Sequence, residues 1–215
     1  MSGQRLRVSE IFFSLQGEAS RVGLPTVFAR LTGCPLRCGY CDTDYAFQGG
    51  EWLSFAAILA RVRAHPTRHV TVTGGEPLAQ SACKALLAVL CDAGFDVSLE
   101  TSGALDIAGV DARVARIVDL KTPGSGEVAR NLWSNLDLLG PRDEVKFVLT
   151  DEADYRWAVA TLRERRIAER CPVLFSPVWG ELDAALLADW ILRDGLPVRM
   201  QAQLHKLLWR EARGR

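Results

Sequence analysis

Short apolar runs bounded by turn residues recur along the whole chain. Runs of this length that are rich in β-branched residues are typical of buried strands. They lie at residues 11–15, 27–31, 70–73, 97–99, 117–120, 145–149, 173–175 and 198–200. The pattern therefore predicts some eight short strands.

Helical patterns lie between several of these strands. Ser54 can cap a first helix whose apolar residues share one face and which ends at His65-Pro66. Three further helices are predicted over residues 81–93, from Asp151 onward, and over residues 183–192.

The order of strands and helices indicates the fold class. Strands that alternate with helices favour parallel pairing with right-handed crossovers. Three or four helices among some eight strands are too few for a complete eight-fold barrel. No repeat or linker divides the sequence. We therefore expect an α/β fold, either an incomplete parallel β/α barrel or an open sheet, as a single domain over residues 1–215.

Composition narrows the class of ligand. The 26 Lys and Arg residues balance 26 Asp and Glu residues, so the basic surplus typical of a nucleic-acid binder is missing. We expect a small-molecule ligand and no direct contact with nucleic acid. No apolar run approaches the roughly 20 residues that span a bilayer, and the start MSGQRLRVSE lacks the apolar region of a signal peptide. No membrane association and a cytoplasmic location are expected.

Three of the six cysteines form a compact motif. Cys34, Cys38 and Cys41 have the spacing C-x3-C-x2-C directly after a predicted strand. Three thiolates on one tight loop can hold three corners of a [4Fe-4S] cluster, which leaves one iron open for a cofactor or substrate. A structural zinc site needs four ligands, and His65 and His69 lie more than 20 residues away. A zinc site that borrows a distant histidine, or a chance cluster, remains the alternative.

The other three cysteines have a different setting. Cys83 and Cys91 lie on the apolar helix CKALLAVLC, and Cys171 begins a strand. All three are interpreted as small buried hydrophobic residues.

A second motif, TVTGGEP at residues 71–77, also follows a predicted strand. Paired glycines let a ligand approach the backbone closely, and the Glu76 carboxylate can accept hydrogen bonds from an ammonium group. A Gly-Gly turn alone is a weak signal, but here it accompanies the cysteine loop.

Together, the cysteine loop and the TGGEP segment resemble the radical S-adenosylmethionine (SAM) superfamily. In that superfamily the open iron of a [4Fe-4S] cluster binds the amino and carboxyl groups of SAM. The chain further resembles the 7-carboxy-7-deazaguanine synthase family. The matching segments are EIFFSLQGE (10–18), Arg30, ETSG (100–103), DLKTP (119–123), KFV (146–148), SPV (176–178) and QLHK (203–206). Only the tail after Lys206 has no clear counterpart, which leaves its place relative to the pocket open.

The resemblance implies a lyase reaction. A 5'-deoxyadenosyl radical takes a hydrogen from C6 of 6-carboxy-5,6,7,8-tetrahydropterin, the ring contracts, and ammonia leaves to give 7-carboxy-7-deazaguanine. This product belongs to the pathway to queuosine, a tRNA modification, and other 7-deazapurines. The hydrogen returns to 5'-deoxyadenosine, so SAM is reused. A flavodoxin or ferredoxin would donate the electron, and a homodimer is expected.

The resemblance also implies substrate-binding residues, namely Leu15, Gln16, Gly17, Glu18, Arg30 and Thr73. The pterin edge presents an amino group and a ring N–H side by side, which a carboxylate such as that of Glu18 can accept in a bidentate way. The Arg30 guanidinium can bind the substrate carboxylate.

Cofactor residues are implied in the same way. The Thr43 hydroxyl would ligate Mg²⁺, which prefers oxygen ligands. SAM would contact Tyr40, Asp42, Gly75, Glu76, Ser102, Lys121 and Ser176. In a parallel α/β arrangement the ends of these strands converge on one mouth.

Two alternatives stay open. An activase of a glycyl-radical enzyme is another short radical SAM protein, but it would act on a protein partner rather than on a pterin. A non-enzymatic zinc-binding adaptor would use the cysteines structurally.

Overall fold

The computed structural model describes residues 4–210, 212 and 214. Its core is one nine-stranded sheet in the order β3-β1-β2-β4-β5-β6-β7-β8-β9, which is not closed. The strands are β1 (Arg5–Leu15), β2 (Pro25–Leu31), β3 (Glu51–Ser54), β4 (His69–Gly74), β5 (Asp96–Thr101), β6 (Ala115–Leu120), β7 (Glu144–Leu149), β8 (Val173–Pro177) and β9 (Arg199–Met200). The expected fold class, an incomplete barrel of the α/β type, is confirmed.

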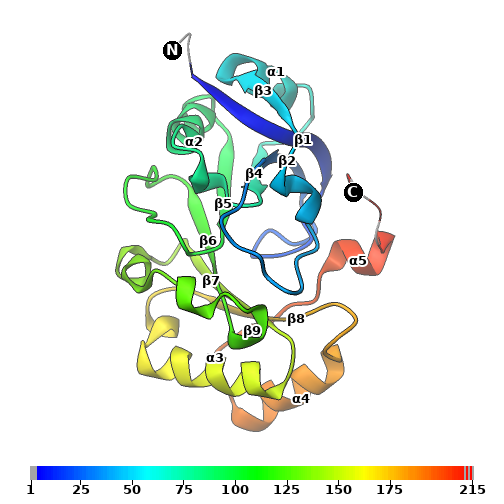
Figure 1. The fold of residues 1–215 in the computed structure, drawn as a ribbon, viewed down its shortest axis with the longest axis vertical. Helices are drawn as coiled ribbons and strands as arrows, with labels where there is room; N and C mark the ends of the chain where they lie inside the picture. The colour runs from blue at the N-terminus through cyan, green and yellow to red at the C-terminus, as the bar shows by residue number, and fades with distance from the viewer. Residues whose placement is uncertain (1–3, 211, 213, 215) are drawn as a thin grey trace.

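Helices cover the outer side of the curved sheet (Figure 1). They are α1 (Phe55–Arg63), α2 (Cys83–Asp92), α3 (Glu152–Glu164) and α4 (Ala184–Asp194), and α5 (Leu204–Trp209) lies apart from them near the carboxyl terminus. Short 3-10 helices occur at Asp44–Phe47, Pro77–Ala79, Pro123–Ser125, Val128–Arg130, Trp133–Leu138 and Ile167–Glu169. The predicted N-cap of α1 is present, since the Ser54 side chain accepts a hydrogen bond from the Ala57 N–H at 3.2 Å.

The expectation of parallel pairing is correct from β2 to β9 and wrong for β1. Strand β1 runs antiparallel to both β2 and β3. The connection between β1 and β2 is a loop of residues 16–24, which is too short for a helical crossover. Strand β3 was not predicted, because only Leu53 within it is buried. The short α5 was not predicted either.

The parallel strands alternate between two environments. One set of side chains packs with the helices in the main apolar core, for example Val72, Leu99, Leu120 and Phe147. The alternate set faces the concave side and is largely polar: Thr71, Thr73, Ser98, Glu100, Asp119, Lys121, Glu144 and Lys146. Because side chains of a strand alternate with period two, each strand supplies the core and the concave side at once.

The expected setting of the other three cysteines is confirmed. Cys83, Cys91 and Cys171 are buried members of the main core. Among the described residues, no helix is long and apolar enough to cross a membrane.

Candidate functional site

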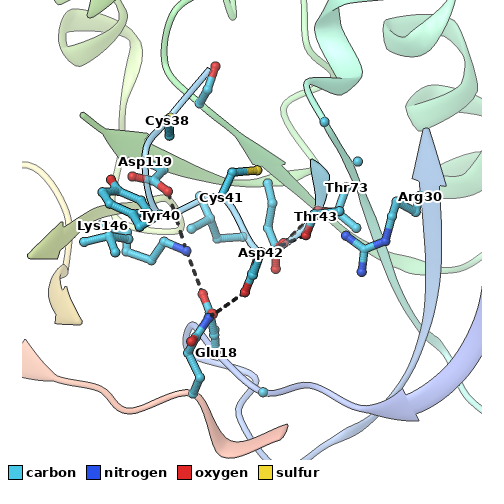
Figure 2. A pocket seen from close by; sticks show the side chains of 18 of the residues that line it. Glu18, Arg30, Cys38, Tyr40, Cys41, Asp42, Thr43, Thr73, Asp119 and Lys146 are labelled. Atoms are coloured by element: carbon cyan, nitrogen blue, oxygen red, sulfur yellow. Dashed lines mark hydrogen bonds and ion pairs between the residues drawn. The ribbon is translucent and has the colours of Figure 1, made fainter. Parts of the chain in front are cut away.

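A pocket of about 260 Å³ opens at the carboxyl ends of the parallel strands. Its walls come from strand ends, from the cysteine loop after β2 and from the carboxyl-terminal segment (Figure 2). The predicted site residues that line it are Leu15, Gln16, Gly17, Glu18, Arg30, Cys34, Cys38, Tyr40, Cys41, Asp42, Thr43, Thr73, Gly75, Ser102 and Lys121. Residues far apart in the sequence thus meet in one cavity.

The cysteine loop rests on the TGGEP turn. The Glu76 N–H donates to the Gly33 carbonyl at 2.8 Å. A Cβ atom on Gly75 would lie 2.5 Å from the Gly33 carbonyl oxygen and 2.7 Å from the Cβ of Cys34. Only glycine therefore allows this close approach. The TGGEP turn therefore positions the cysteine loop.

The three loop thiols are free and half-buried, and they line the same pocket. Burial raises the pKa of Cys34, Cys38 and Cys41, so an unliganded loop would carry thiols that lose protons on binding a metal. Within the described part of the chain, no three His, Cys, Asp or Glu side chains gather closely enough to hold a single metal ion. A cubane cluster instead needs thiolates at separate corners, and this donor set fits that group.

Glu76 has a different setting from the one its motif suggested. Its carboxylate is fully buried and does not line the pocket. The oxygens accept hydrogen bonds from Leu78 N–H at 2.9 Å, from the Thr101 hydroxyl at 2.9 Å, and from Ser102 N–H at 2.7 Å. The carboxylate therefore joins the end of β4 to the end of β5. A contact between Glu76 and the amino group of SAM stays a prediction.

Glu18 is at the centre of a part-buried charge network (Figure 2). Its carboxylate lies 2.6 Å from the Lys146 ammonium and accepts a hydrogen bond from the Gln203 amide at 2.8 Å. The same ammonium lies 3.7 Å from Asp119. Burial alone would raise the pKa of Glu18, but Lys146 holds that pKa below its ordinary value. The Glu18 side chain is thus an ionised acceptor facing the pocket.

A second part-buried carboxylate lies close to the first. Glu100 accepts hydrogen bonds from the Thr73 hydroxyl at 2.9 Å and from the Gln16 amide at 3.3 Å. Burial and the nearby Glu18 charge raise the pKa of Glu100. The pocket therefore holds two neighbouring carboxylates whose pKa values are shifted in opposite directions.

Arg30 lies on the opposite wall from Glu18 and Lys146 (Figure 2). Its Nε donates to Glu10 at 2.7 Å, and its guanidinium lies 5.7 Å from the centre of the Phe12 ring. Tyr45 also donates its hydroxyl hydrogen to Glu10, at 2.8 Å. These contacts fix the direction in which the guanidinium points.

Gln203, His205 and Lys206 of the carboxyl-terminal segment line the pocket, whereas none of the described residues of the tail after Lys206 does. The Lys206 ammonium lies 3.1 Å from Asp42, whose other oxygen accepts a hydrogen bond from the Thr43 hydroxyl at 3.0 Å. Burial would raise the pKa of Asp42, but Lys206 lowers it to about 2. His205 packs against Gly17, where any side chain would collide with its ring.

Some buried polar atoms near the site have no hydrogen-bond partner within the described residues. They include the Tyr40 hydroxyl, one carboxylate oxygen of Asp119 and the Ser176 hydroxyl. The other Asp119 oxygen lies 3.0 Å from the Lys121 ammonium. Because buried polar groups normally have partners, the atoms of Tyr40 and Asp119, which line the pocket, suit a ligand there. Ser176 is buried two residues before the pocket-lining Val178 and does not itself line the cavity.

Comparison with known proteins agrees with this geometry. Residues 30–171 match the family model described as the Radical SAM superfamily. The chain is 47% identical over 213 residues to the 7-carboxy-7-deazaguanine synthase of Chlorobaculum tepidum, covering 97% of each chain. It is 41% identical to the synthase of Koribacter versatilis, over 95% of this chain and 97% of that one. The chain belongs to this synthase family, within the radical SAM superfamily.

The fold comparison points the same way. The crystal structure of QueE from Escherichia coli superposes with a TM-score of 0.76 at 24% identity, covering 94% of this chain and 95% of that chain. The predicted family and fold are both confirmed. A radical SAM protein carries a [4Fe-4S] cluster and SAM, which the three pocket-lining thiols of the loop accommodate.

Several residues that line the pocket were not predicted as site residues from the sequence. They are Glu100, Asp119, Lys146, Gln203 and His205. All lie in segments that carried the family resemblance, and three alternate with apolar residues along β5, β6 and β7. A polar residue between apolar ones on a buried parallel strand was the signal that could have identified Glu100, Asp119 and Lys146. Gln203 and His205 lie outside the strands and carried no such signal.

Proposed function

We propose that this chain is a 7-carboxy-7-deazaguanine synthase, which converts 6-carboxy-5,6,7,8-tetrahydropterin into 7-carboxy-7-deazaguanine with loss of ammonia. One observation carries the proposal. The ionised Glu18 carboxylate and the three loop cysteines line the same pocket, so a group that reads the pterin edge lies in the cavity of the cluster loop. The product would enter the route to queuosine or another 7-deazapurine.

The pocket residues would bind and orient the substrate. When bound, the [4Fe-4S] cluster and SAM supply a 5'-deoxyadenosyl radical for hydrogen abstraction. Glu18 accepts hydrogen bonds from the amino group and ring N–H of the pterin edge, with Gln16 beside it. Arg30, oriented by Glu10, presents its terminal nitrogens to the substrate carboxylate. Leu15, Gly17 and Thr73 complete the substrate wall.

Lys146 keeps Glu18 ready for this role. Its ammonium lies 2.6 Å from the Glu18 carboxylate, and it compensates the charge that burial would otherwise neutralise. Around SAM, the candidate contacts are Tyr40, Asp42, Gly75, Glu76, Ser102, Lys121 and Ser176. The unpartnered hydroxyl of the pocket-lining Tyr40 supports its place in this set.

Magnesium is the third proposed cofactor, with the Thr43 hydroxyl as its protein ligand. Mg²⁺ commonly keeps waters and bridges protein and substrate oxygens. We expect Mg²⁺ to raise turnover, and we expect Thr43→Ala to need about tenfold more Mg²⁺ for half-maximal rate. The iron content should be unchanged, because the hydroxyl would not contact iron. Titration of the rate with MgCl₂ in both proteins tests this, and an identical Mg²⁺ response would remove Thr43 from the site.

Glu18→Gln tests whether the Glu18 carboxylate binds the amino group and ring N–H of the pterin. The amide keeps the size but places a donor where an acceptor is needed. We expect kcat/KM for the pterin to fall by roughly 1.5–3 kcal/mol in transition-state stabilisation, the range for a hydrogen bond to a charged group. SAM affinity and iron content should stay at wild-type values. Equal losses in pterin turnover and SAM affinity, or no loss in either, would show that Glu18 is structural.

The proposal extends to the setting of the enzyme. Residues 1–215 would act as one radical SAM core domain, in a cytoplasmic homodimer that receives its electron from a flavodoxin or ferredoxin and contacts neither nucleic acid nor a membrane. Purified, reconstituted protein should turn over the pterin with no partner polypeptide other than the electron donor. A requirement for a protein substrate would instead favour a glycyl-radical activase, and a colourless protein with stoichiometric zinc would favour an adaptor.

A further inference from the structure

The loop of residues 16–24, called here the floor loop, joins β1 to β2 and forms one wall of the pocket. Its first three residues line the cavity. The next residue, Ala19, is 3% exposed and packs with Ile117 of β6 and Leu174 of β8 inside the curved sheet. The floor loop therefore enters the interior of the partial barrel at Ala19, and its residues 16–18, which are proposed to bind the substrate, face the pocket.

Ala19 has an unusual backbone conformation. Its φ angle is +62°, in the left-handed region that residues with a side chain rarely adopt. Such a conformation is strained for a residue with a side chain and persists only where surrounding contacts hold it. The neighbouring residue in the chain is Glu18, so the turn at Ala19 sets the direction in which the Glu18 side chain leaves the backbone.

A side-chain contact that holds this turn comes from Gln201, at the far end of the sequence. Its side-chain oxygen accepts the Ala19 N–H at 2.6 Å, and its side-chain nitrogen donates to the Ala19 carbonyl at 3.0 Å. Gln201 is 6% exposed, and its own N–H donates to the Phe175 carbonyl at 2.9 Å, which continues the pairing of β9 with β8. The oxygen and the nitrogen of the buried Gln201 amide thus bond to the N–H and the carbonyl of Ala19.

Two further anchors hold the floor loop beside this one. The Ser20 N–H donates to both carboxylate oxygens of Glu144, at 3.0 and 3.1 Å, at the start of β7. Arg21 donates to the Asp96 carbonyl at 3.1 Å and to its carboxylate at 2.5 Å, at the start of β5. These anchors fix where the floor loop crosses the sheet. Gln201 holds both backbone polar groups of Ala19, whose carbonyl also accepts the Val22 N–H at 3.2 Å within the loop.

We propose that Gln201 is a positioning residue for the substrate. Its amide holds Ala19 so that the Glu18 carboxylate meets Lys146 and Gln203 and faces the pterin. This inference rests on the proposed function. Gln201 does not line the pocket, so it acts through the backbone of Ala19 and not by touching the substrate.

Gln201→Met tests the role with a side chain of similar size that removes both hydrogen bonds. We expect the pterin to bind about tenfold more weakly to the unreduced holoenzyme, measured by titration calorimetry without turnover. Hydrogen exchange of the Ala19 and Ser20 amides should become faster, while SAM affinity stays unchanged. Gln80→Met is the matched control, because the Gln80 amide holds the N–H and carbonyl of Arg7 in the same two-bond manner, at 2.8 Å each. It should leave pterin affinity unchanged.

Gln201→Glu provides a conformational rescue that a purely structural role would not give. A protonated carboxyl can accept the Ala19 N–H and donate to the Ala19 carbonyl, whereas an ionised one can only accept. Pterin affinity of this variant should therefore be near wild type at acid pH and fall as pH rises through the pKa of the new carboxyl. The loop itself contains Glu18 and Arg21, and the titratable and charged groups that contact it are Lys146, Glu100, Glu144, Asp96, Arg199 and His205. All of them are present in the wild-type control.

The outcomes separate this inference from the proposed function. Faster exchange at Ala19 with unchanged pterin affinity in Gln201→Met would overturn the positioning role and leave the function intact. A pH-independent affinity in Gln201→Glu would do the same. Absence of pterin binding to the wild-type protein would overturn the proposed function itself.

Discussion

Replacing Cys34, Cys38 or Cys41 by alanine should abolish the visible iron-sulfur absorbance and the reductive cleavage of SAM. Each of these thiols would hold one corner of the cluster, and the loop offers no fourth cysteine to substitute. Because the cluster is the source of the radical chemistry, pterin turnover should fall to background in all three variants. Iron analysis, absorbance and detection of 5'-deoxyadenosine after anaerobic reconstitution measure the three consequences.

Cys83→Ala is the matched control for the loop variants. The Cys83 side chain is fully buried in the main apolar core, and burial raises the pKa of its thiol to about 12. Its removal should leave a small cavity and lower the free energy of unfolding by on the order of 1 kcal/mol, with iron content unchanged. Loss of iron in this variant, or in the corresponding Cys91 or Cys171 variant, would contradict the assignment of a three-cysteine site.

Lys146→Met should give the largest loss of stability among the pocket variants. The change removes the ammonium that lies 2.6 Å from Glu18 and 3.7 Å from Asp119, and both carboxylates stay in the pocket. Breaking a fully buried ion pair by removal of one partner costs about 3–5 kcal/mol. Because the Lys146 and Glu18 side chains are 14% and 15% exposed, we expect a loss at or below the lower end of that range. Urea unfolding at neutral pH measures the change. Lys84→Met, which removes an ammonium that donates to the Ala108 carbonyl, should cost much less.

The pH dependence gives a second readout of the same pair. In the wild type the pKa of Glu18 is depressed below 4.5, so its contribution to stability is full above that value and is lost as pH falls through the depressed pKa. The pKa of Lys146 is raised above 10.5, so its contribution is full below that value and is lost as pH rises through the raised pKa. The pair therefore stabilises the fold across the whole neutral range.

In Lys146→Met the sign reverses for Glu18. Burial and the neighbouring Glu100 and Asp119 carboxylates should raise the pKa of Glu18 above its ordinary value. The variant should then lose stability as pH rises from about 4.5 toward neutrality, where the wild type does not. A variant whose stability follows the wild-type pH profile would contradict the proposed pairing. In the double variant Lys146→Met/Glu18→Gln, the loss should be smaller than the sum of the single losses.

The strand alternation shows how far sequence reasoning reaches in this fold. The apolar positions of β4 to β8 predicted the buried strands, and the cysteine loop with Gly75 predicted the cluster site. The polar residues between those apolar positions, such as Glu100 and Lys146, line the pocket on the concave side of the sheet. They were identifiable in principle, because a buried parallel strand otherwise has little reason to alternate.

Other parts of the site depend on contacts that the local pattern does not carry. The bond between Gln201 and Ala19 joins residues 182 positions apart in the sequence, and the left-handed turn at Ala19 has no glycine to signal it. The antiparallel β1 follows from the short floor loop rather than from its own apolar pattern. The carboxyl-terminal residues 203–206 reach the pocket only because the sheet curves, which brings β9 next to the floor loop.

Anaerobic reconstitution followed by mass spectrometry tests the central claim most directly. The reconstituted protein would be incubated with reductant, SAM, Mg²⁺ and 6-carboxy-5,6,7,8-tetrahydropterin. We predict a product with the mass of 7-carboxy-7-deazaguanine, accompanied by ammonia, in molar excess over any 5'-deoxyadenosine that accumulates, because SAM is reused. Cleavage of SAM to 5'-deoxyadenosine with the pterin recovered unchanged would contradict the account.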